Sequence, residues 1–337
     1  MTGATGLVGS HVAERLLADG WRVRALVRQG SRDGWLRERG VEVVPGDTLD
    51  GASFVAAANG CDAVFHNAAA VTPRGGWEAY RRPNVDGTAN AIAAAEHAGA
   101  RLVHLSSVAV YGPQGRYDAA ARGGRTTEDA PLGPLPDGAL YARSKRDSEA
   151  LVLQAHADGR VWATALRPSV IYGPRDRQFV PRIARILRYG VAPIVGSGRT
   201  TLSVVHAANV ADGVVRAAAH DAAGGRAYNL ANDYDVAVAD FFRLAGEGLG
   251  RRVRLLRLPG WVASAAMYVV KAGLAIATGG GLSVVATTSL DFLTKDNPFA
   301  SERARRELGW APPVRPEVGI PAAFRWWHDA RTRGEPG

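Results

Sequence analysis

The chain has 337 residues, of which 47% are hydrophobic and 22% are charged, and its formal net charge is +9. This composition is typical of soluble globular proteins and excludes the disordered, collagen-like and disulfide-framework classes. Cys61 is the single cysteine, which excludes an internal disulfide and a zinc or iron–sulfur site built from cysteines. We therefore expect a cytoplasmic protein that holds no metal ion and carries no secretory signal.

The distribution of charged and apolar residues bears on the partners. Only three of the 41 basic residues are lysines, and the arginines are scattered rather than clustered with aromatic residues. We expect no nucleic-acid partner, although a basic surface attracts a phosphorylated cofactor. An apolar run at 261–278, interrupted by Lys271, predicts a helix of a substrate-binding lobe. A helix resting on a membrane surface is the alternative, and we expect no stable membrane insertion.

Short valine-rich runs alternate with amphipathic stretches in the first half of the chain. This alternation predicts right-handed βαβ crossovers and an α/β fold with helices on both faces of a parallel sheet, the doubly wound Rossmann arrangement. In chain order, the patterns predict a helix at 8–18, strands at 21–27 and 41–44, a helix at 52–58, a strand at 63–66, a helix at 84–98, a strand at 101–106, a helix at 141–157 and a strand at 161–166.

The alternation of strand and helix patterns becomes less regular in the second half of the chain, which predicts a second structural unit. We expect residues 1–168 to form a dinucleotide-binding domain, to which residues 201–231 return. Residues 169–200 and 232–330 would form a smaller C-terminal substrate-binding lobe. The segment 111–140 is too long for an ordinary connection, so it is either a functional loop or a mobile one.

Gly3, Gly6 and Gly9 recur at every third position directly before the first predicted helix. Glycines permit a tight turn and a close approach of the backbone, so a pyrophosphate can lie against the free N–H groups at the helix N-terminus. The pattern alone is weak, and its place before a helix strengthens it. A simple tight turn is the alternative.

A glycine loop of this type follows a strand of about five residues, yet only Met1 and Thr2 precede Gly3. Without such a strand, its two neighbours would leave buried N–H and C=O groups unpaired, which is costly. We therefore expect the true start to lie upstream, with Met1 at the last position of the strand.

Arg28 stands at the end of the strand predicted at 21–27, where NAD-specific folds carry an acidic residue for the ribose 2′-hydroxyl. Together with Ser31 and Arg32 it could pair with a 2′-phosphate, because a guanidinium offers a planar fork to phosphate oxygens. This favours NADP(H) over NAD(H), with an ordinary solvated arginine as the alternative. Asp47 ends the next strand and is placed to reach the adenine side, or forms a plain turn.

Tyr141 and Lys145 lie four residues apart, so a phenol and an ammonium share one face of the predicted helix. The ordinary pKa of tyrosine is about 10, and a neighbouring ammonium and an oxidised nicotinamide would lower it by stabilising the phenolate. Ser107 follows a parallel strand at its carboxyl end and could hold a substrate oxygen for Tyr141. The alternatives are a solvated Tyr–Lys pair and a buried or capping serine at Ser106 or Ser107.

With these motifs assembled, the chain resembles the extended short-chain dehydrogenase/reductase superfamily, also called the NAD-dependent epimerase/dehydratase family. The resemblance runs from Met1 to about residue 313 and rests on the joint order of several motifs. These motifs lie at 2–9, 46–50, 66–70, 84–88, 106–112, 141–145, 166–174 and 308–310 with Pro312.

The resemblance implies a role for each matching residue. Ser107, Tyr141 and Lys145 match the catalytic trio, with Tyr141 as acid/base, Lys145 lowering its pKa and binding the nicotinamide ribose, and Ser107 orienting the reacting oxygen. Asn84 matches a family asparagine whose role is cofactor binding or purely structural. The other implied cofactor contacts are Gly3, Thr5, Gly6, Leu7, Val8 and Gly9 at the pyrophosphate, Asp47 and Thr48 at the adenine, Ala68 and Ala69 beside the ribose, and Pro168 and Ser169 at the nicotinamide.

Departures from the family pattern narrow the expected activity. Family dehydratases carry Thr-Asp-Glu where this chain has Ser107-Val108-Ala109, and family epimerases carry a diphosphate-binding arginine where it has Leu202. The segments 205–211, 291–299 and 303–310 are similar to the branch of 3β-hydroxysteroid dehydrogenases and dihydroflavonol reductases. This branch implies an apolar alcohol or ketone as the small-molecule substrate.

We therefore expect hydride transfer between NADP(H), or alternatively NAD(H), and a secondary alcohol or ketone. The alternatives are a sugar-nucleotide epimerase and a non-catalytic dinucleotide-sensing or scaffold protein, although relatives of the latter sort usually lose the Tyr–Lys pair. The resemblance also implies a homodimer through the helices at 84–98 and 141–157. We expect His206 to be a structural residue, because no triad or metal set surrounds it in the sequence.

Overall fold

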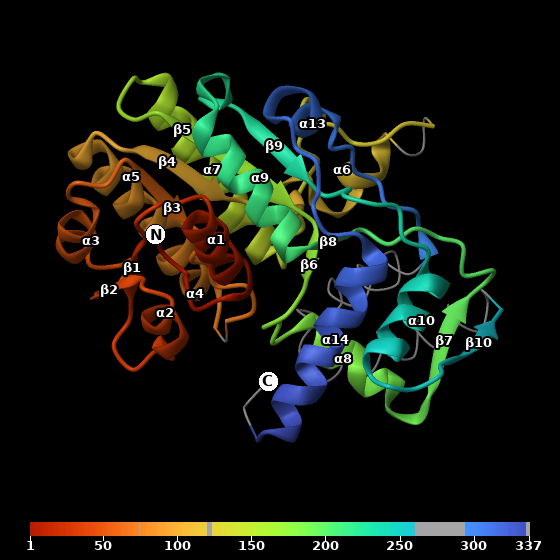
Figure 1. Ribbon diagram of the computed structural model, residues 1–337. Coiled ribbons are helices and arrows are strands. Elements are labelled where there is room, and N and C mark those ends of the chain that lie inside the picture. Colours follow the sequence, from red (N-terminus) through yellow and green to blue (C-terminus); the bar gives the residue numbers. More distant parts are fainter. Residues whose placement is uncertain (74, 120–122, 260–293, 335–337) are drawn as a thin grey trace.

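The computed structural model describes residues 1–73, 75–119, 123–259 and 294–334 (Figure 1). The apolar run at 261–278, predicted to be a helix, lies outside the described residues. Within the described part of the chain, no helix is long and apolar enough to cross a membrane.

A parallel sheet forms the centre of the first half of the molecule. Thr2 bridges the two parts of this sheet, because it pairs in parallel with Leu26 of β1 on one side and His66 of β3 on the other. The described strands therefore run in the order β2-β1-Thr2-β3-β4-β5-β9, and the predicted doubly wound α/β fold is confirmed. The strands are β1 (Arg24–Val27), β2 (Glu42–Pro45), β3 (Ala63–His66), β4 (Arg101–Leu105), β5 (Ala163–Pro168) and β9 (Ala227–Leu230).

Met1 and Thr2 occupy the place of the central strand. The Met1 carbonyl accepts a hydrogen bond from Leu26 N at 2.9 Å, and Thr2 N donates to the Phe65 carbonyl at 2.9 Å. These two residues are thus hydrogen-bonded to β1 on one side and to β3 on the other. The strand order along the sheet reverses at this point, and sheets of this type bind their ligands there. A start upstream of Met1 stays a prediction.

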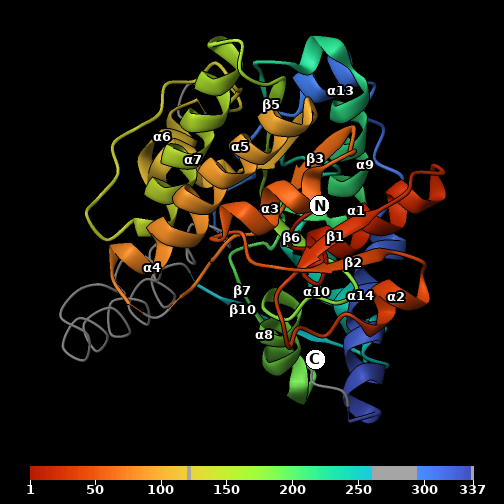
Figure 2. The same ribbon diagram turned by 90° about the vertical axis from the view of Figure 1, so that its left-hand side faces the viewer.

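Helices cover both faces of the sheet (Figures 1 and 2). Successive residues of a strand point to opposite faces of the sheet. In β4, Leu102 and Val103 accordingly pack into two different hydrophobic clusters. On one face α1 (Leu7–Ala18) packs against α9 (Ala207–Ala219), with α13 (Glu302–Leu308) beside α9. The helices α3 (Gly51–Ala58), α5 (Gly87–Ala98) and α7 (Leu140–Ala157) cover the other face.

A second hydrophobic core lies below the sheet in Figure 1 and is built from later parts of the chain. Phe241 lies at its centre and makes ring contacts with Tyr172, Phe179, Phe242 and Phe324. Two pairs of short parallel strands and three helices enclose it: β6 (Val170–Tyr172) with β8 (Val204–His206), β7 (Val191–Val195) with β10 (Arg254–Leu258), α8 (Phe179–Ile186), α10 (Val238–Gly248) and α14 (Pro316–Thr332).

Some elements differ from their predicted bounds. The strand predicted from Trp21 begins at Arg24, because Trp21 N still donates to the Leu16 carbonyl at the end of α1. The helix predicted from Asn84 begins as a π-helical turn at Arg82–Asp86, which contains the helix-disfavouring Pro83. In the first half of the chain, three short helices of the described structure were not predicted, namely α2 (Gly34–Glu38), α4 (Trp77–Arg81) and α6 (Gly112–Asp118).

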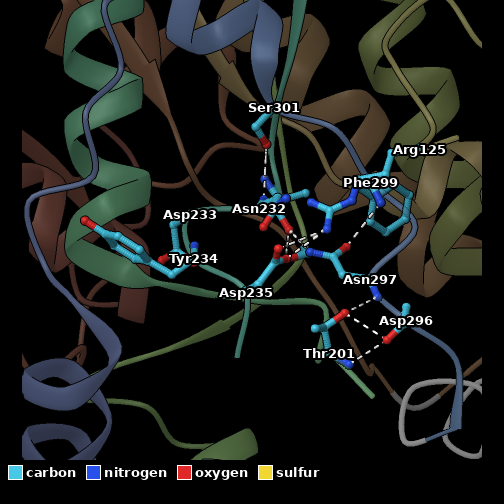
Figure 3. A network of polar contacts seen from close by, with 12 residues as sticks. Arg125, Thr201, Asn232, Asp233, Tyr234, Asp235, Asp296, Asn297, Phe299 and Ser301 are labelled. Carbon is cyan, nitrogen blue, oxygen red and sulfur yellow. Dashed lines mark hydrogen bonds and ion pairs between the residues drawn. The ribbon is translucent and has the colours of Figure 1, made fainter. Parts of the chain in front are cut away.

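The later part of the segment 111–140 is bound to the rest of the molecule (Figure 3). Thr126 N donates to the Pro298 carbonyl at 2.6 Å, and Ala300 N donates back to the Thr126 carbonyl at 3.0 Å. Arg125 forms an ion pair with Asp235 at 3.0 Å. Residues 125 and 126 are therefore fixed by contacts with the loop after β9 and with the start of the C-terminal segment.

A buried ion pair joins α7 to β5. The Arg167 guanidinium contacts the Glu149 carboxylate at 2.5 Å, and their side chains are only 7% and 5% exposed. Arg167 also donates to the Tyr111 hydroxyl at 2.8 Å, which in turn donates to Asn229 on β9 at 2.9 Å. One buried guanidinium thus links a surface-covering helix to two strands of the sheet.

Replacing Glu149 by Gln should lower the free energy of unfolding by about 3–5 kcal/mol, because the Arg167 charge stays buried without its partner. Urea unfolding followed by tryptophan fluorescence measures this loss. Glu96→Gln is the matched control, since it breaks an exposed pair with Arg160 and should cost less than about 1 kcal/mol. Equal effects of the two variants would contradict the assignment.

Candidate active site

The glycine loop lies at the carboxyl edge of the sheet, between Thr2 and α1. Gly3 has a φ of +67°, which L side chains rarely adopt. A Cβ on Gly9 would lie only 2.1 Å from the Gly3 carbonyl oxygen, and one on Gly3 would lie 2.8 Å from Ala68 N. Side chains at these positions would therefore push the loop away from α1 and from the loop after β3.

The N-terminus of α1 is open to an anion. Its first residue is Leu7, no side chain caps the helix at Gly6, and no acidic residue stands in its first turn. The unpaired N–H groups and the positive end of the helix dipole suit a diphosphate. The geometry of this loop therefore fits the dinucleotide that the sequence predicts here, with Thr5 half-buried beside Gly6.

The residues predicted for the adenosine side lie at the ends of β1 and β2. Arg28 is exposed, and neither it nor Arg32 forms an ion pair with a residue that the structure describes. The Asp47 carboxylate accepts a hydrogen bond from Leu49 N at 2.9 Å, so it closes a turn. Thr48 is half-buried, and its carbonyl accepts from the Asn90 amide at 2.8 Å.

Asn84 joins the loop after β3 to α7. Its side-chain oxygen accepts from Ala70 N at 2.7 Å, and its amide nitrogen donates to the Ala70 carbonyl at 2.9 Å and to Ser144 Oγ at 2.8 Å. Each end of the amide is thus bound to the protein itself. These contacts favour the structural role for Asn84, which holds the loop containing Ala68 and Ala69 in place.

Ser107, Tyr141 and Lys145 come together at the carboxyl end of β4. The Ser107 hydroxyl lies near enough to the Tyr141 phenol to act on its pKa, which it lowers. Ser107 Oγ also accepts from Ala109 N at 3.2 Å, which fixes its position at the start of a short helical turn. Lys145 Nζ is buried and donates to the Leu105 carbonyl at 2.6 Å.

The protein environment changes the acidity of two of these groups. Burial raises the pKa of Tyr141 above its ordinary value of 10.0, while the nearby Ser107 hydroxyl acts in the opposite direction. Burial lowers the pKa of Lys145 from 10.5 to about 8, while the Glu149 carboxylate acts to raise it. The Tyr141 phenol is therefore hard to ionise here, and lowering its pKa requires positive charge near the oxygen.

Pro168 is the last residue of β5 and Ser169 lies between β5 and β6, and both residues are buried. Ser169 Oγ donates to the Ala231 carbonyl at 3.4 Å, so it is bound to the protein. His206 caps α9, because its Nδ1 accepts from Ala208 N at 3.2 Å, and its ring packs edge to face on Tyr172. These contacts give His206 a structural role.

Two histidines near Lys145 did not stand out in the sequence as parts of the site. His66 and His104 are register partners on β3 and β4, and their rings stack with centroids 5.6 Å apart. Burial first, and then the Lys145 charge, lower the pKa of both, that of His66 to about 3. Each histidine lies in an apolar run that predicts only a buried strand. The sequence could have indicated that the two rings meet only if the register between β3 and β4 had been known.

Comparison with known proteins identifies the family of the chain. Residues 1–231 match the NAD dependent epimerase/dehydratase family. The chain is 30% identical to a 4-hydroxy-2-methyl-3-oxo-4-farnesyl-3,4-dihydroquinoline-1-oxide ketoreductase of Stigmatella aurantiaca, over 96% of this chain and 94% of that protein. It is also 30% identical to a decarboxylating sterol-4-alpha-carboxylate 3-dehydrogenase of Bos taurus, over 77% of this chain and 72% of the relative.

A solved structure shows the same fold. The crystal structure of gox2253 is similar to this chain with a TM-score of 0.75 and 28% sequence identity, over 100% of this chain and 98% of that one. The open α1 N-terminus, the position of Thr2 at the reversal of strand order and these matches agree. The chain belongs to the NAD dependent epimerase/dehydratase family and is an oxidoreductase.

Proposed function

We propose that the protein transfers a hydride between NADP(H) and a secondary alcohol or ketone of apolar character. The observation that carries the proposal is the approach of three side chains at the carboxyl end of β4: Ser107 follows this strand and acts on the pKa of Tyr141, and the Lys145 ammonium donates to the Leu105 carbonyl at 2.6 Å. Two hydroxyl groups that meet at this edge can together bind one substrate oxygen.

Each residue of the trio has a distinct part in the proposed reaction. When bound, the nicotinamide supplies or accepts the hydride and, in its oxidised form, places positive charge near the phenol. In the direction of reduction, Ser107 and Tyr141 hold the carbonyl oxygen and the Tyr141 hydroxyl gives its proton to it. The part we propose for Lys145 is to favour the phenolate that remains, since an ammonium brought near the phenol in the cofactor complex would lower its pKa.

The surroundings of the trio favour this reaction over the other reactions of the family. Removal of water needs a carboxylate and a carboxylic acid, and the positions after Ser107 are the apolar Val108 and Ala109. Leu202 is 1% exposed in the second core, so it offers nothing to a nucleotide diphosphate. An oxidoreductase acting on a ketone or alcohol needs neither group.

The names of the relatives support the class of substrate. One is named as a ketoreductase of a farnesylated quinoline oxide, and another as a 3-dehydrogenase of a sterol carboxylate. Both molecules are large and mostly apolar. We therefore propose a polycyclic or prenylated ketone as the substrate class to be tested first.

Tyr141→Phe should abolish turnover, by more than about 10²-fold, because it removes the proton donor and retains the ring. NADPH binding, measured by nicotinamide fluorescence, should stay within about twofold, because the phenol oxygen is not the main cofactor contact. A screen of NADPH oxidation with apolar ketones measures the first quantity. Turnover that survives the substitution contradicts the assigned role.

The adjacent serines offer a matched pair of variants. Ser107→Ala should lower kcat by about 10²-fold, because one of two donors to the substrate oxygen is lost. Ser106→Ala should leave kcat within about twofold, because the buried Ser106 hydroxyl has no hydrogen-bond partner in the described structure. Steady-state kinetics of both variants decide the matter, and a larger loss from Ser106→Ala would reverse the assignment.

Arg28→Ala tests whether the protein prefers NADP(H) to NAD(H). NADPH affinity should fall about 10- to 100-fold with NADH affinity unchanged, because a charge-assisted bond to the 2′-phosphate is worth about 1.5–3 kcal/mol. Fluorescence titration with both cofactors measures this, with the exposed Arg22→Ala as the charge-matched control. If the wild-type protein prefers NADH, or if NAD(H) co-purifies tightly with it, NAD(H) is the cofactor and the alternative function as a sugar-nucleotide epimerase is favoured.

The chain has only three lysines, so Lys145 can be titrated directly. In spectra of protein labelled at lysine Cε, one resonance should titrate near pH 8 and vanish in Lys145→Met. Because the unfolded state holds this proton until about pH 10.5, stability should rise with pH between 8 and 10.5 through this group, and Lys145→Met should lose that increment. Lysine resonances that all titrate above pH 10 would be inconsistent with the buried ammonium.

A further inference from the structure

Two segments of the second lobe carry arginines without a single acidic residue. Residues 177–199 and 251–257 together contain nine arginines and no Asp or Glu, in a chain whose whole formal net charge is +9. The fold brings them together, because β7 pairs with β10 in parallel (Figure 1). The Arg251 guanidinium also donates to the Arg188 carbonyl at 2.6 Å. Positive charge from two distant parts of the sequence therefore gathers around one pair of strands.

The β7–β10 pair has an exposed outer face. Ile194 is buried in the second core, so the alternating residues Val191 and Pro193 point away from it and are exposed. The parallel register sets Arg254 beside Val191 and Leu256 beside Pro193. We call these four residues the outer face, and it combines apolar side chains with an arginine.

Large apolar side chains on this face and in the segment that leads into it are exposed. Leu256 is 54% exposed, Tyr189, two residues before β7, is 78% exposed, and Ile186 at the end of α8 is 46% exposed. The Arg188 guanidinium lies 4.4 Å from the centre of the Tyr189 ring. Aliphatic and aromatic side chains that stand in water among arginines mark a surface for binding.

The arginines of the two segments lack carboxylate partners within salt-bridge distance among the described residues. None of the nine forms an ion pair with a residue that the structure describes, whereas Arg81, Arg160 and Arg303 in other parts of the molecule pair with carboxylates. Unpaired guanidinium groups are ready to bind phosphate oxygens, because their planar forks match phosphate geometry. The partner is therefore rich in negative charge.

We propose that the outer face and the arginines around it bind the headgroup layer of an anionic phospholipid bilayer. Arginines would contact lipid phosphates, Tyr189 would lie at the level of the headgroups, and Leu256 and Ile186 would reach the first carbons of the acyl chains. A nucleic acid would use the charge but would gain nothing from exposed aliphatic groups, which is why the lipid surface is the better fit. The proposal does not depend on the reaction proposed above.

The test uses the full chain and sucrose-loaded vesicles in a sedimentation assay. Binding to phosphatidylcholine vesicles that contain about one-third phosphatidylglycerol should exceed binding to pure phosphatidylcholine by more than about tenfold. It should fall steeply when salt is raised to about 1 M, where the Debye length shrinks to about 3 Å. Equal binding to both vesicle types, or no binding to either, overturns the proposal.

Variants separate the charge from the apolar contribution. Arg254→Gln with Arg257→Gln should weaken binding to anionic vesicles about thirtyfold, because each arginine contributes about fivefold. The matched control, Arg22→Gln with Arg325→Gln, removes two exposed arginines outside these segments and should change binding less than about threefold. If both pairs have the same effect, only the net charge of the chain acts and the surface is not specific.

Tyr189→Ser with Leu256→Ser should weaken vesicle binding about tenfold or more, because apolar surface no longer enters the bilayer. Circular dichroism and unchanged thermal unfolding show that these exposed changes leave the fold intact. Binding of a duplex DNA oligomer that is insensitive to this double variant, combined with weak vesicle binding, would assign the arginines to a nucleic acid instead.

Discussion

The polar inner face of α7 is the feature on which the candidate site depends. Ser144, Lys145, Ser148 and Glu149 are all buried on this helix. A buried polar group is costly unless it is hydrogen-bonded, so each must find a partner on the structure that covers it. The partners lie on the turn before α5, on β4 and on β5, which fixes α7 against all of them. They are Asn84, the Leu105 carbonyl, His104 and Arg167.

A second set of buried polar contacts holds the two halves of the molecule together. Asp233, after β9, accepts from His206 N at 3.0 Å and from the Asn209 amide at 2.7 Å. Asn209 in turn binds both the N–H and the carbonyl of Val314. The C-terminal segment is thereby fixed to α9. These directed contacts join the end of β8, α9 and the loop after β9 to the segment that leads into α14.

Much of the fold could be predicted, because local patterns determine local elements. Strand β3 has the predicted bounds, and the helix predicted at 141–157 differs from α7 by one residue. The sequence left alternatives open where contacts distant in sequence decide the outcome. Residues 125 and 126 were expected in a functional or a mobile loop, and in the structure they are fixed by partners that lie more than 100 positions later in the chain. No local pattern contains that information.

The candidate site shows the same division. Spacing alone placed Tyr141 and Lys145 on one helix face, and position after a strand placed Ser107 near the edge of the sheet. The pairing of Tyr141 with Ser107 depends on how α7 lies against β4. The structural contacts of Asn84, and the turn closed by Asp47, likewise required coordinates.

The sequence by itself determined the doubly wound α/β fold, the glycine loop before α1 and the identity of the candidate trio. These features rest on residue type and short-range spacing, which act through backbone conformation and helix or strand periodicity. Only the tertiary structure decided the buried partners of α7, the acidity of Lys145 and the meeting of two arginine-rich segments at β7 and β10. Burial and strand register set these, because both are properties of residues brought together from distant parts of the chain.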